Sequence, residues 1–139
     1  MNKIQCILKR KISHEAMRIL GGQTMPYETI IRTYFTAWQK RDWDSVESLL
    51  ADGFTFTSPY DDHIDKDEYK QKCWNSVKAI EAYEYVTIME RGDEAFVRYK
   101  SRLNGMLVQN TEHFLFQNRK IQGIDVFFGR PEDSPSQDA

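Results

Sequence analysis

The chain has 139 residues, of which 40% are hydrophobic, 29% charged and 13% aromatic, a composition that excludes a disordered chain and suits one domain with a core. Its net charge of −2 combines +4 over residues 1–24 with −6 over the remainder, so nucleic acid is not expected as the main partner. No apolar run has the length of a membrane-spanning helix. Cys6 and Cys73 form no disulfide framework and no zinc-binding pattern, which favours a reducing cytoplasm.

Residues 1–24 form a basic, weakly amphipathic extension that ends near Gly21-Gly22 and is too interrupted by charge for a secretory signal. We expect a frayed appendage, and Met25 is an alternative start of the native protein. The domain is expected over residues 25–129. Residues 130–139 form a polar tail that is predicted to be disordered.

Three helices are predicted in the first half of the domain. Apolar residues recur at four-residue spacing from Ile30 through Tyr34 to Trp38, which indicates an amphipathic helix after Pro26. Asp42 can cap a second helix that Gly53 can end. After the short β-rich run "FTFTSP", Asp65 and Glu68 form a capping box for a third helix. The buried stripe of that helix is predicted to be Tyr69, Cys73, Val77 and Ile80.

The second half is predicted to be a meander of four antiparallel strands. The runs are "EAYEYVTIME", "EAFVRYKSRL", "MLVQNTEHFLF" and "IQGIDVFFG", and Asn104-Gly105 is a strong hairpin signal. Helices segregated from antiparallel strands predict an α+β fold. A curved sheet wrapped around helices would leave a cone-shaped cavity. Aromatic residues make up 13% of the chain, which is high for a small domain, and we expect many of them to line this cavity.

From about Tyr27 to Phe128 the chain resembles the nuclear transport factor 2-like (NTF2-like) superfamily. The resemblance is closest to its SnoaL-like branch and extends in outline to ketosteroid isomerases. It is carried by "YFTAWQKRDWDSVESLLADGFTFTSP", "DDHIDKDEYKQKCW" and "NTEHFLF…KIQGIDVFFG". It implies a cone-shaped barrel of curved antiparallel sheet on three helices, and no cofactor. It is poor evidence for function, because one fold hosts many functions.

The resemblance also suggests roles for single residues. Tyr34 falls where ketosteroid isomerases have a tyrosine that donates to the substrate oxyanion, and Glu112 in "EHF" falls where they have a neutral aspartic acid as second donor. Ser58, before Pro59, falls where they have the aspartate base. A serine without a partner is no base at pH 7, so the isomerase proton shuttle is not expected in that form. Enzymes of the SnoaL type use an acid/base carboxylate on the cavity wall, for which Glu112 and Asp125 are the candidates.

Glu112 lies on the apolar face of its strand, with Val108, Phe114 and Phe116. Burial there would raise its pKa, and a neutral carboxyl can donate a hydrogen bond to a developing oxyanion. The alternative is an ion pair with Arg98 or Arg102, although strand parity puts both arginines on the other face.

Tyr34 could be a pocket donor paired with Glu112 or a core tyrosine with a backbone or water partner. Asp125 could enter the cavity as the runner-up base, or could lie on the outer sheet face. The expected ligand-binding residues are Trp38, Phe54, Phe56, Ser58, Tyr60, His63, Trp74, Tyr99, Asn110, Phe114 and Phe127.

The acidic stretch "PYDDHIDKDE" does not fit an EF-hand loop, since capping and turn chemistry account for its acids. No metal is expected, and the stretch is predicted to be a loop at the cavity mouth where His63 could touch a ligand. His113 has the opposite parity to Glu112, and the resemblance implies a homodimer through that outer face.

Two functions remain open from the sequence. One is a cofactor-independent isomerase, cyclase or dehydratase that acts on a small hydrophobic carbonyl compound, with Tyr34 and Glu112 stabilising an enolate. The other is a non-catalytic domain for ligand binding or dimerisation, which Ser58 at the base position favours. A second carboxylate on the cavity wall would distinguish them.

Overall fold

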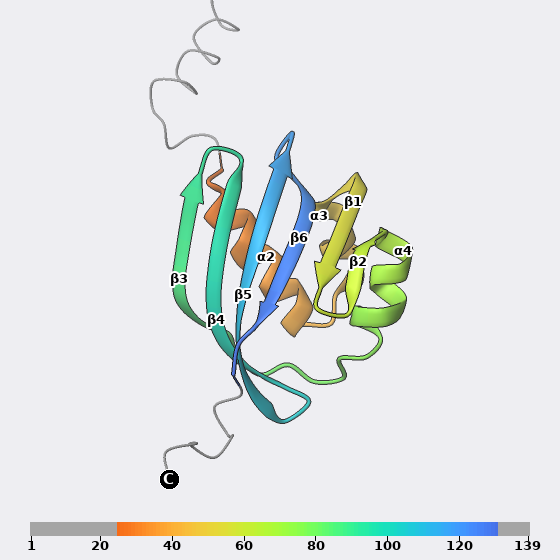
Figure 1. The fold of residues 1–139 in the computed structure, drawn as a ribbon, viewed down its shortest axis with the longest axis vertical. Helices are drawn as coiled ribbons and strands as arrows, with labels where there is room; N and C mark the ends of the chain where they lie inside the picture. The colour runs from red at the N-terminus through yellow and green to blue at the C-terminus, as the bar shows by residue number, and fades with distance from the viewer. Residues whose placement is uncertain (1–24, 131–139) are drawn as a thin grey trace, which may run out of the picture.

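The computed structural model describes residues 25–130, so the extension at 1–24 and the tail beyond Arg130 lie outside the described residues. The elements in chain order are α2 (Tyr27–Gln39), α3 (Trp43–Leu49), β1 (Leu50–Ser58), β2 (Asp61–Ile64), α4 (Lys66–Tyr69), the π-helical turn η1 (Lys70–Trp74), β3 (Glu84–Arg91), β4 (Glu94–Leu103), β5 (Met106–Gln117) and β6 (Lys120–Phe128). The strands form one curved sheet in the order β2-β1-β6-β5-β4-β3 (Figure 1). Within 25–130 no helix is long and apolar enough to cross a membrane.

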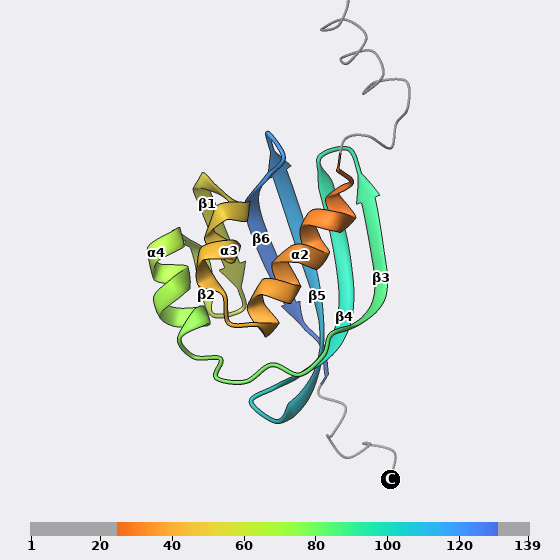
Figure 2. The ribbon, with the colours of Figure 1, turned by 180° about the vertical axis from the view of Figure 1, so that it is seen from behind.

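Helix α2 lies across the concave face of this sheet (Figure 2). The spacing of its apolar residues puts Ile30, Ile31, Tyr34, Phe35 and Trp38 on one side of the helix, and all five are buried. The predicted helix after Pro26 is therefore confirmed. Its buried face supplies one side of the space enclosed by the sheet.

The second helix begins as predicted but ends earlier. The Asp42 side chain accepts a hydrogen bond from the backbone N–H of Ser45 at 3.1 Å, and the helix stops at Leu49 rather than at Gly53. Leu50 already pairs with Ile121 of β6, and this sheet pairing overrides the local helix signal. Gly53 lies inside β1 where the register shifts between Leu50 and Thr55, a usual place for a strand glycine.

The predicted four-strand meander is confirmed, with β3, β4, β5 and β6 antiparallel in sequence order. Two features were not predicted. Strand β1 joins β6 in parallel, and the stretch Asp61–Ile64, expected to be a loop, forms the short strand β2 opposite β1. The β1–β2 turn therefore belongs to the sheet.

The third helix, α4, lies beside β2 at one edge of the sheet (Figure 2). Asp65 caps α4 by accepting from the backbone N–H of Glu68 at 2.9 Å, as predicted. The connecting segment then crosses to β3 beneath α2 (Figure 2). The Asn104 side chain accepts from the backbone N–H groups of Lys78 and Ala79. Asn104 and Gly105 both have positive φ, so the predicted hairpin turn also holds this segment in place.

Candidate functional site

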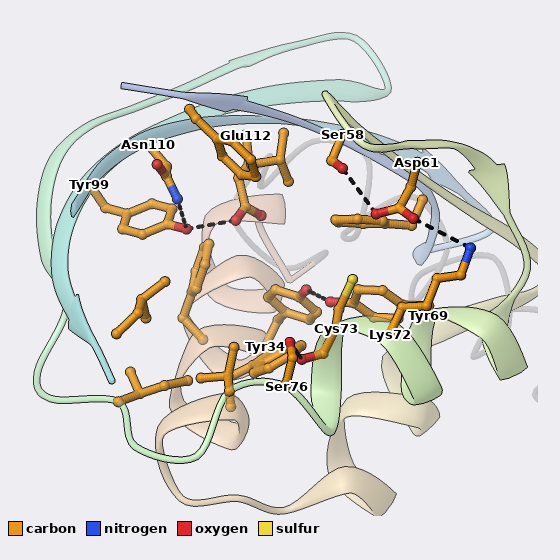
Figure 3. Close-up of a pocket in the computed structure, with 18 of the residues that line it drawn as sticks. Tyr34, Ser58, Asp61, Tyr69, Lys72, Cys73, Ser76, Tyr99, Asn110 and Glu112 are labelled. Carbon is orange, nitrogen blue, oxygen red and sulfur yellow. Dashed lines mark hydrogen bonds and ion pairs between the residues drawn. The ribbon is translucent and has the colours of Figure 1, made fainter. Parts of the chain in front are cut away.

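The concave face of the sheet, α2, and the α4–η1 arm enclose a cavity of about 400 Å³ (Figure 3). Most of its lining is apolar, and its aromatic members include Tyr34, Phe35, Trp38, Phe56, Tyr69 and Tyr83. The volume lies at the lower end of the range of small-molecule sites, roughly 300–1,000 Å³. Many of the aromatic residues of the chain therefore surround this one cavity.

Glu112 projects from the middle of β5 into this cavity, and only 6% of it is exposed. Its Oε1 accepts a hydrogen bond from the Tyr99 hydroxyl at 2.8 Å, and the Asn110 side-chain amide donates to the same hydroxyl at 3.3 Å. Its Oε2 is buried and has no partner among the described residues. Glu112 is therefore not paired with Arg98 or Arg102, and one carboxyl oxygen is left for a ligand.

Burial raises the pKa of Glu112 to about 7, while the hydrogen bond from Tyr99 acts to lower it. Desolvation disfavours the ionised form of a carboxyl group, whereas a donor to that form favours it. Near neutral pH both the acid and the carboxylate are populated. This is the property that a general acid or base requires.

Two more phenols lie across the cavity from the sheet (Figure 3). The hydroxyls of Tyr34 and Tyr69 are hydrogen-bonded to each other, so Tyr34 is paired with Tyr69 and not with Glu112. Burial raises the pKa of both tyrosines well above the ordinary value. They remain protonated at neutral pH, and because one hydroxyl donates to the other, one O–H of the pair is left as a neutral hydrogen-bond donor.

A second polar cluster lies on the β2 side of the cavity. Ser58 donates from Oγ to Asp61 Oδ2 at 3.1 Å, and Lys72 Nζ lies 3.6 Å from Asp61 Oδ1. All three residues line the cavity. Lys72 also pairs with Glu68 at 3.3 Å, and the hydrogen bond to Glu68 is the main reason that the pKa of Lys72 is raised.

The cavity also holds a thiol, which is unsuited to nucleophilic chemistry. Burial raises the pKa of Cys73 to about 12, and the thiolate is the reactive form of cysteine. In the part of the chain described here, no group of three or more histidine, cysteine, aspartate or glutamate residues could hold a metal ion.

Many of the predicted site residues line this one cavity. They are Tyr34 and Glu112 among the predicted catalytic residues, and Trp38, Phe56, Ser58, Tyr60, Tyr99 and Asn110 among the predicted ligand-binding residues. Tyr60 is 85% exposed, so it lies at the rim. The alternation of side-chain directions along β5 was enough to predict that Asn110 and Glu112 point to the same side of the sheet.

Three predicted ligand-binding residues are buried behind the lining instead. Phe54 packs against Tyr69 with ring centroids 5.2 Å apart, and Trp74 packs against Trp38 at 4.7 Å. Phe114 packs edge-on against Tyr34 at 5.6 Å. An apolar pattern identifies the buried face of an element, but it does not separate the lining from the layer behind it.

Three others point away from the cavity, which corrects the prediction. Asp125 is paired with His113 in the sheet register, and this row lies on the outer face, so Asp125 is not a cavity base. Phe127 follows it by two residues on the same face and is 53% exposed. The His63 side chain is 72% exposed and contacts Asp62 through Nδ1 at 2.5 Å.

The sequence analysis missed several lining residues, of which Asp61, Tyr69, Lys72 and Phe128 matter most. Tyr69 was assigned to the buried stripe of the third helix, together with Cys73, Val77 and Ile80. All four line the cavity, but the helical segment ends at Trp74, so the prediction of a helix through Val77 and Ile80 is wrong. Asp61 was assigned to turn chemistry. Its place opposite Ser58 depends on the pairing of β1 with β2, for which four residues carry little signal.

Comparison with known proteins agrees with this architecture. The SnoaL-like domain family matches residues 31–127, whereas no functionally curated protein matches the sequence. Similar solved structures include an NTF2-like protein of unknown function from Cytophaga hutchinsonii (17% identity, 78% of this chain and 94% of that chain, TM-score 0.63). A putative ketosteroid isomerase from Kribbella flavida is also similar (16% identity, 77% and 80%, TM-score 0.62).

A third similar structure is a putative polyketide cyclase from Sinorhizobium meliloti (20% identity, 71% of this chain and 94% of that chain, TM-score 0.58). At these identities the three structures establish the fold alone. The family match covers most of the chain, and the α+β cone expected from the sequence is confirmed by the sheet and its structural neighbours. The chain therefore belongs to the SnoaL-like domain family, within the NTF2-like fold.

Proposed function

We propose that the cavity binds a small, hydrophobic carbonyl compound and that Glu112 takes part in cofactor-independent acid/base chemistry on it. The reaction would be of the isomerase, cyclase or dehydratase type. The observation that carries the proposal is the Glu112 carboxyl, which is buried in an aromatic cavity with Oε2 unpartnered. A buried polar atom without a partner is costly, and a ligand that supplies the missing partner would remove that cost.

The protonation behaviour of Glu112 supports a reactive role. In its neutral form the carboxyl can donate a hydrogen bond to an oxygen that gains negative charge, and an apolar site strengthens that interaction. The Tyr34–Tyr69 pair supplies one further hydroxyl donor across the cavity, because the other hydroxyl donates within the pair. The arrangement favours a neutral ligand with one polar group, because most of the lining is apolar.

Two of the structural neighbours bear names that fit this chemistry, a putative ketosteroid isomerase and a putative polyketide cyclase. Both names describe reactions on carbonyl compounds. The neighbours support the choice of probe compounds, while the residues of this chain support the mechanism.

The alternative function is non-catalytic binding of a small apolar ligand. It is favoured by Ser58, which occupies the position where the resemblance to ketosteroid isomerases would require an aspartate, and by Asp125, which lies on the outer face. A binder would hold the same ligand through Glu112 without moving a proton. Proton exchange therefore separates the two functions.

The test uses cyclic ketones and β,γ-unsaturated ketones of one and two rings, in heavy water. Ligand-observed NMR gives the affinity, and loss of the proton signal next to the carbonyl gives the exchange rate. We expect binding with exchange in the wild-type protein, and a loss of affinity of about tenfold or more in Glu112→Leu, which removes the hydrogen-bonding group. Glu47→Leu, which changes an exposed glutamate outside the cavity, is the matched control.

Binding without exchange would favour the non-catalytic alternative. If no compound binds, or if Glu112→Leu binds as well as the Glu47→Leu control, the proposed use of the cavity is wrong.

The outer face of the sheet supports the expected homodimer as a separate proposal. It exposes Phe96, Leu115 and Phe127, and His113 stacks on Phe96 with ring centroids 4.3 Å apart. Sedimentation analysis of the wild-type protein and of Phe127→Glu tests this pairing. A monomeric wild-type protein at micromolar concentration would exclude a stable dimer.

A further inference from the structure

We infer that Asp61 is the second acid/base group of the cavity, which moves a carbon-bound proton of a ligand whose carbonyl oxygen is held by Glu112. This assignment rests on the proposed function. It names the second carboxylate that acid/base chemistry in the cavity requires besides Glu112. Neither Ser58 nor Asp125 can provide that group, since the first is a hydroxyl and the second lies on the outer face.

The β1–β2 hairpin directs Asp61 into the cavity. Ser58 and Asp61 are partners in the strand register, so Pro59 and Tyr60 form the turn between them. The Asp61 side chain is only 14% exposed, and it lines the same cavity as Glu112. This degree of burial is unusual for an aspartate at a hairpin turn, where carboxylates generally face water.

Two neighbours hold the Asp61 carboxylate in position. Ser58 donates to Oδ2 at 3.1 Å, which gives the serine at this position the partner that the sequence did not reveal. Lys72 lies 3.6 Å from Oδ1 and is shared with Glu68 at 3.3 Å. Because Lys72 Nζ is nearer to Glu68, the contact with Asp61 leaves that carboxylate less firmly engaged.

Asp61 and Glu112 approach the cavity from different elements. Figure 3 shows Glu112 extending from β5, and Asp61 between Ser58 and Lys72 on the β2 side. The hydroxyls of Tyr34 and Tyr69 lie on the helical side of the same space. A ligand whose oxygen reaches Glu112 would therefore present its ring carbons toward the walls formed by Asp61 and the two tyrosines.

The proposed step transfers one proton and needs no further reactant. The Asp61 carboxylate takes a proton from the carbon next to the ligand carbonyl. The electron pair of the broken C–H bond forms a C=C bond to the carbonyl carbon, and the negative charge that gathers on oxygen is stabilised by the neutral Glu112 carboxyl. Protonated Asp61 then returns the proton, either to the same carbon or to the γ-carbon of a β,γ-unsaturated ketone, which shifts the double bond.

The test compares Asp61→Asn with Asp62→Asn, using the same one-ring and two-ring β,γ-unsaturated ketones in heavy water. Asparagine can still accept from Ser58. Asp62 is the next residue of β2, its side chain is 90% exposed, and it does not line the cavity. We expect Asp61→Asn to lower the exchange rate about 100-fold or more, the usual contribution of a general base, with affinity changed less than about threefold. Asp61→Glu should restore part of the rate, and Asp62→Asn should stay near wild type.

The outcomes separate this inference from the proposed function. If the wild-type protein exchanges the probe, Glu112→Leu does not, and folded Asp61→Asn exchanges it at the wild-type rate, only the role of Asp61 is overturned. If the wild-type protein binds no probe, the proposed function fails and the inference fails with it. Circular dichroism and the urea midpoint of each variant establish that the rates refer to folded protein.

Discussion

The two ends of the cavity place the same functional group in opposite surroundings. At the closed end Glu112 lies among aromatic rings, and its one hydrogen-bond donor among residues 25–130 is Tyr99. At the mouth Asp61 has a serine donor and a lysine within 4 Å, and Tyr60 beside it is 85% exposed. Burial raises the pKa of Glu112 to about 7.

The difference lies in what surrounds each carboxyl, which is a set of aromatic rings at Glu112 and two polar side chains at Asp61. Removing a carboxyl from water favours its protonated form. The packing around Glu112 therefore affects its protonation as well as the stability of the fold. The predictions below alter one end of the cavity and use the other end for comparison.

The largest effect on stability is expected from Phe35→Ala, which removes a ring from the packing at the closed end of the cavity. Phe35 is 2% exposed and contacts the rings of Tyr34, Tyr83 and Tyr99. Removing a fully buried phenylalanine costs about 3–5 kcal/mol, because transfer energy is lost and a cavity remains. Urea denaturation measures the change in the free energy of unfolding. Tyr60→Ala at the mouth should cost about 1 kcal/mol or less, and equal costs would contradict the contrast between the ends.

The second prediction concerns pH and Glu112. The folded-state pKa of about 7 is above the ordinary value of 4.5, so between these two values the folded state retains a proton that the unfolded state has lost. The free energy of unfolding should therefore decrease as pH rises from 4.5 to 7 and then level off, by about 3 kcal/mol in total. Glu112→Gln should lack this component.

Urea denaturation of both proteins at a series of pH values from 4.5 to 8.5 measures the effect as a difference, in which the other titrating groups largely cancel. Parallel curves for the wild-type protein and Glu112→Gln would mean that the carboxyl is hydrated or paired in solution. The closed end would then resemble the mouth.

The third prediction separates the two influences on Glu112. Tyr99→Phe removes the hydrogen bond that acts to lower the pKa of this carboxyl, so its pKa should rise above 7. It also deprives the Asn110 amide of its acceptor, at a cost of about 1 kcal/mol. NMR titration of the side-chain carboxyl measures the first effect. Tyr83→Phe, which removes another cavity-lining hydroxyl, is the control, and an equal shift in both variants would contradict the assigned cause.

The two ends also differ in how far they could be predicted from sequence. Glu112 and Asn110 alternate with outward residues along a twelve-residue strand, and a period of two over that length defines a face. The same logic left the direction of Asp125 open, because both faces of its strand are mostly apolar. The structure settles it through the register that pairs Asp125 with His113.

The residues at the mouth were much harder to predict from the local sequence. Asp61 reaches the cavity only because β2 pairs with β1, and Lys72 reaches Asp61 from the α4–η1 arm. The parallel pairing of Leu50 with Ile121 joins residues far apart in the chain, and it also decides where α3 ends. Such contacts depend on the assembled sheet. The sequence therefore predicted capping, turns and a place at the cavity mouth for this acidic stretch, but it did not identify Asp61 as a lining residue.

The smallest effect on stability is expected from Lys72→Gln at the mouth. The lysine is 54% exposed and shares its charge between Asp61 and Glu68, and exposed ion pairs contribute little because water and salt screen them. The urea midpoint should match that of the wild-type protein within error. Exchange of the ketone probes should nevertheless change, since the carboxylate of Asp61 would lose one of its two positioning contacts. A lowered midpoint with an unchanged exchange rate would contradict this expectation, because Lys72 would then act as a structural link between β2 and η1 and not as a neighbour of a working carboxylate.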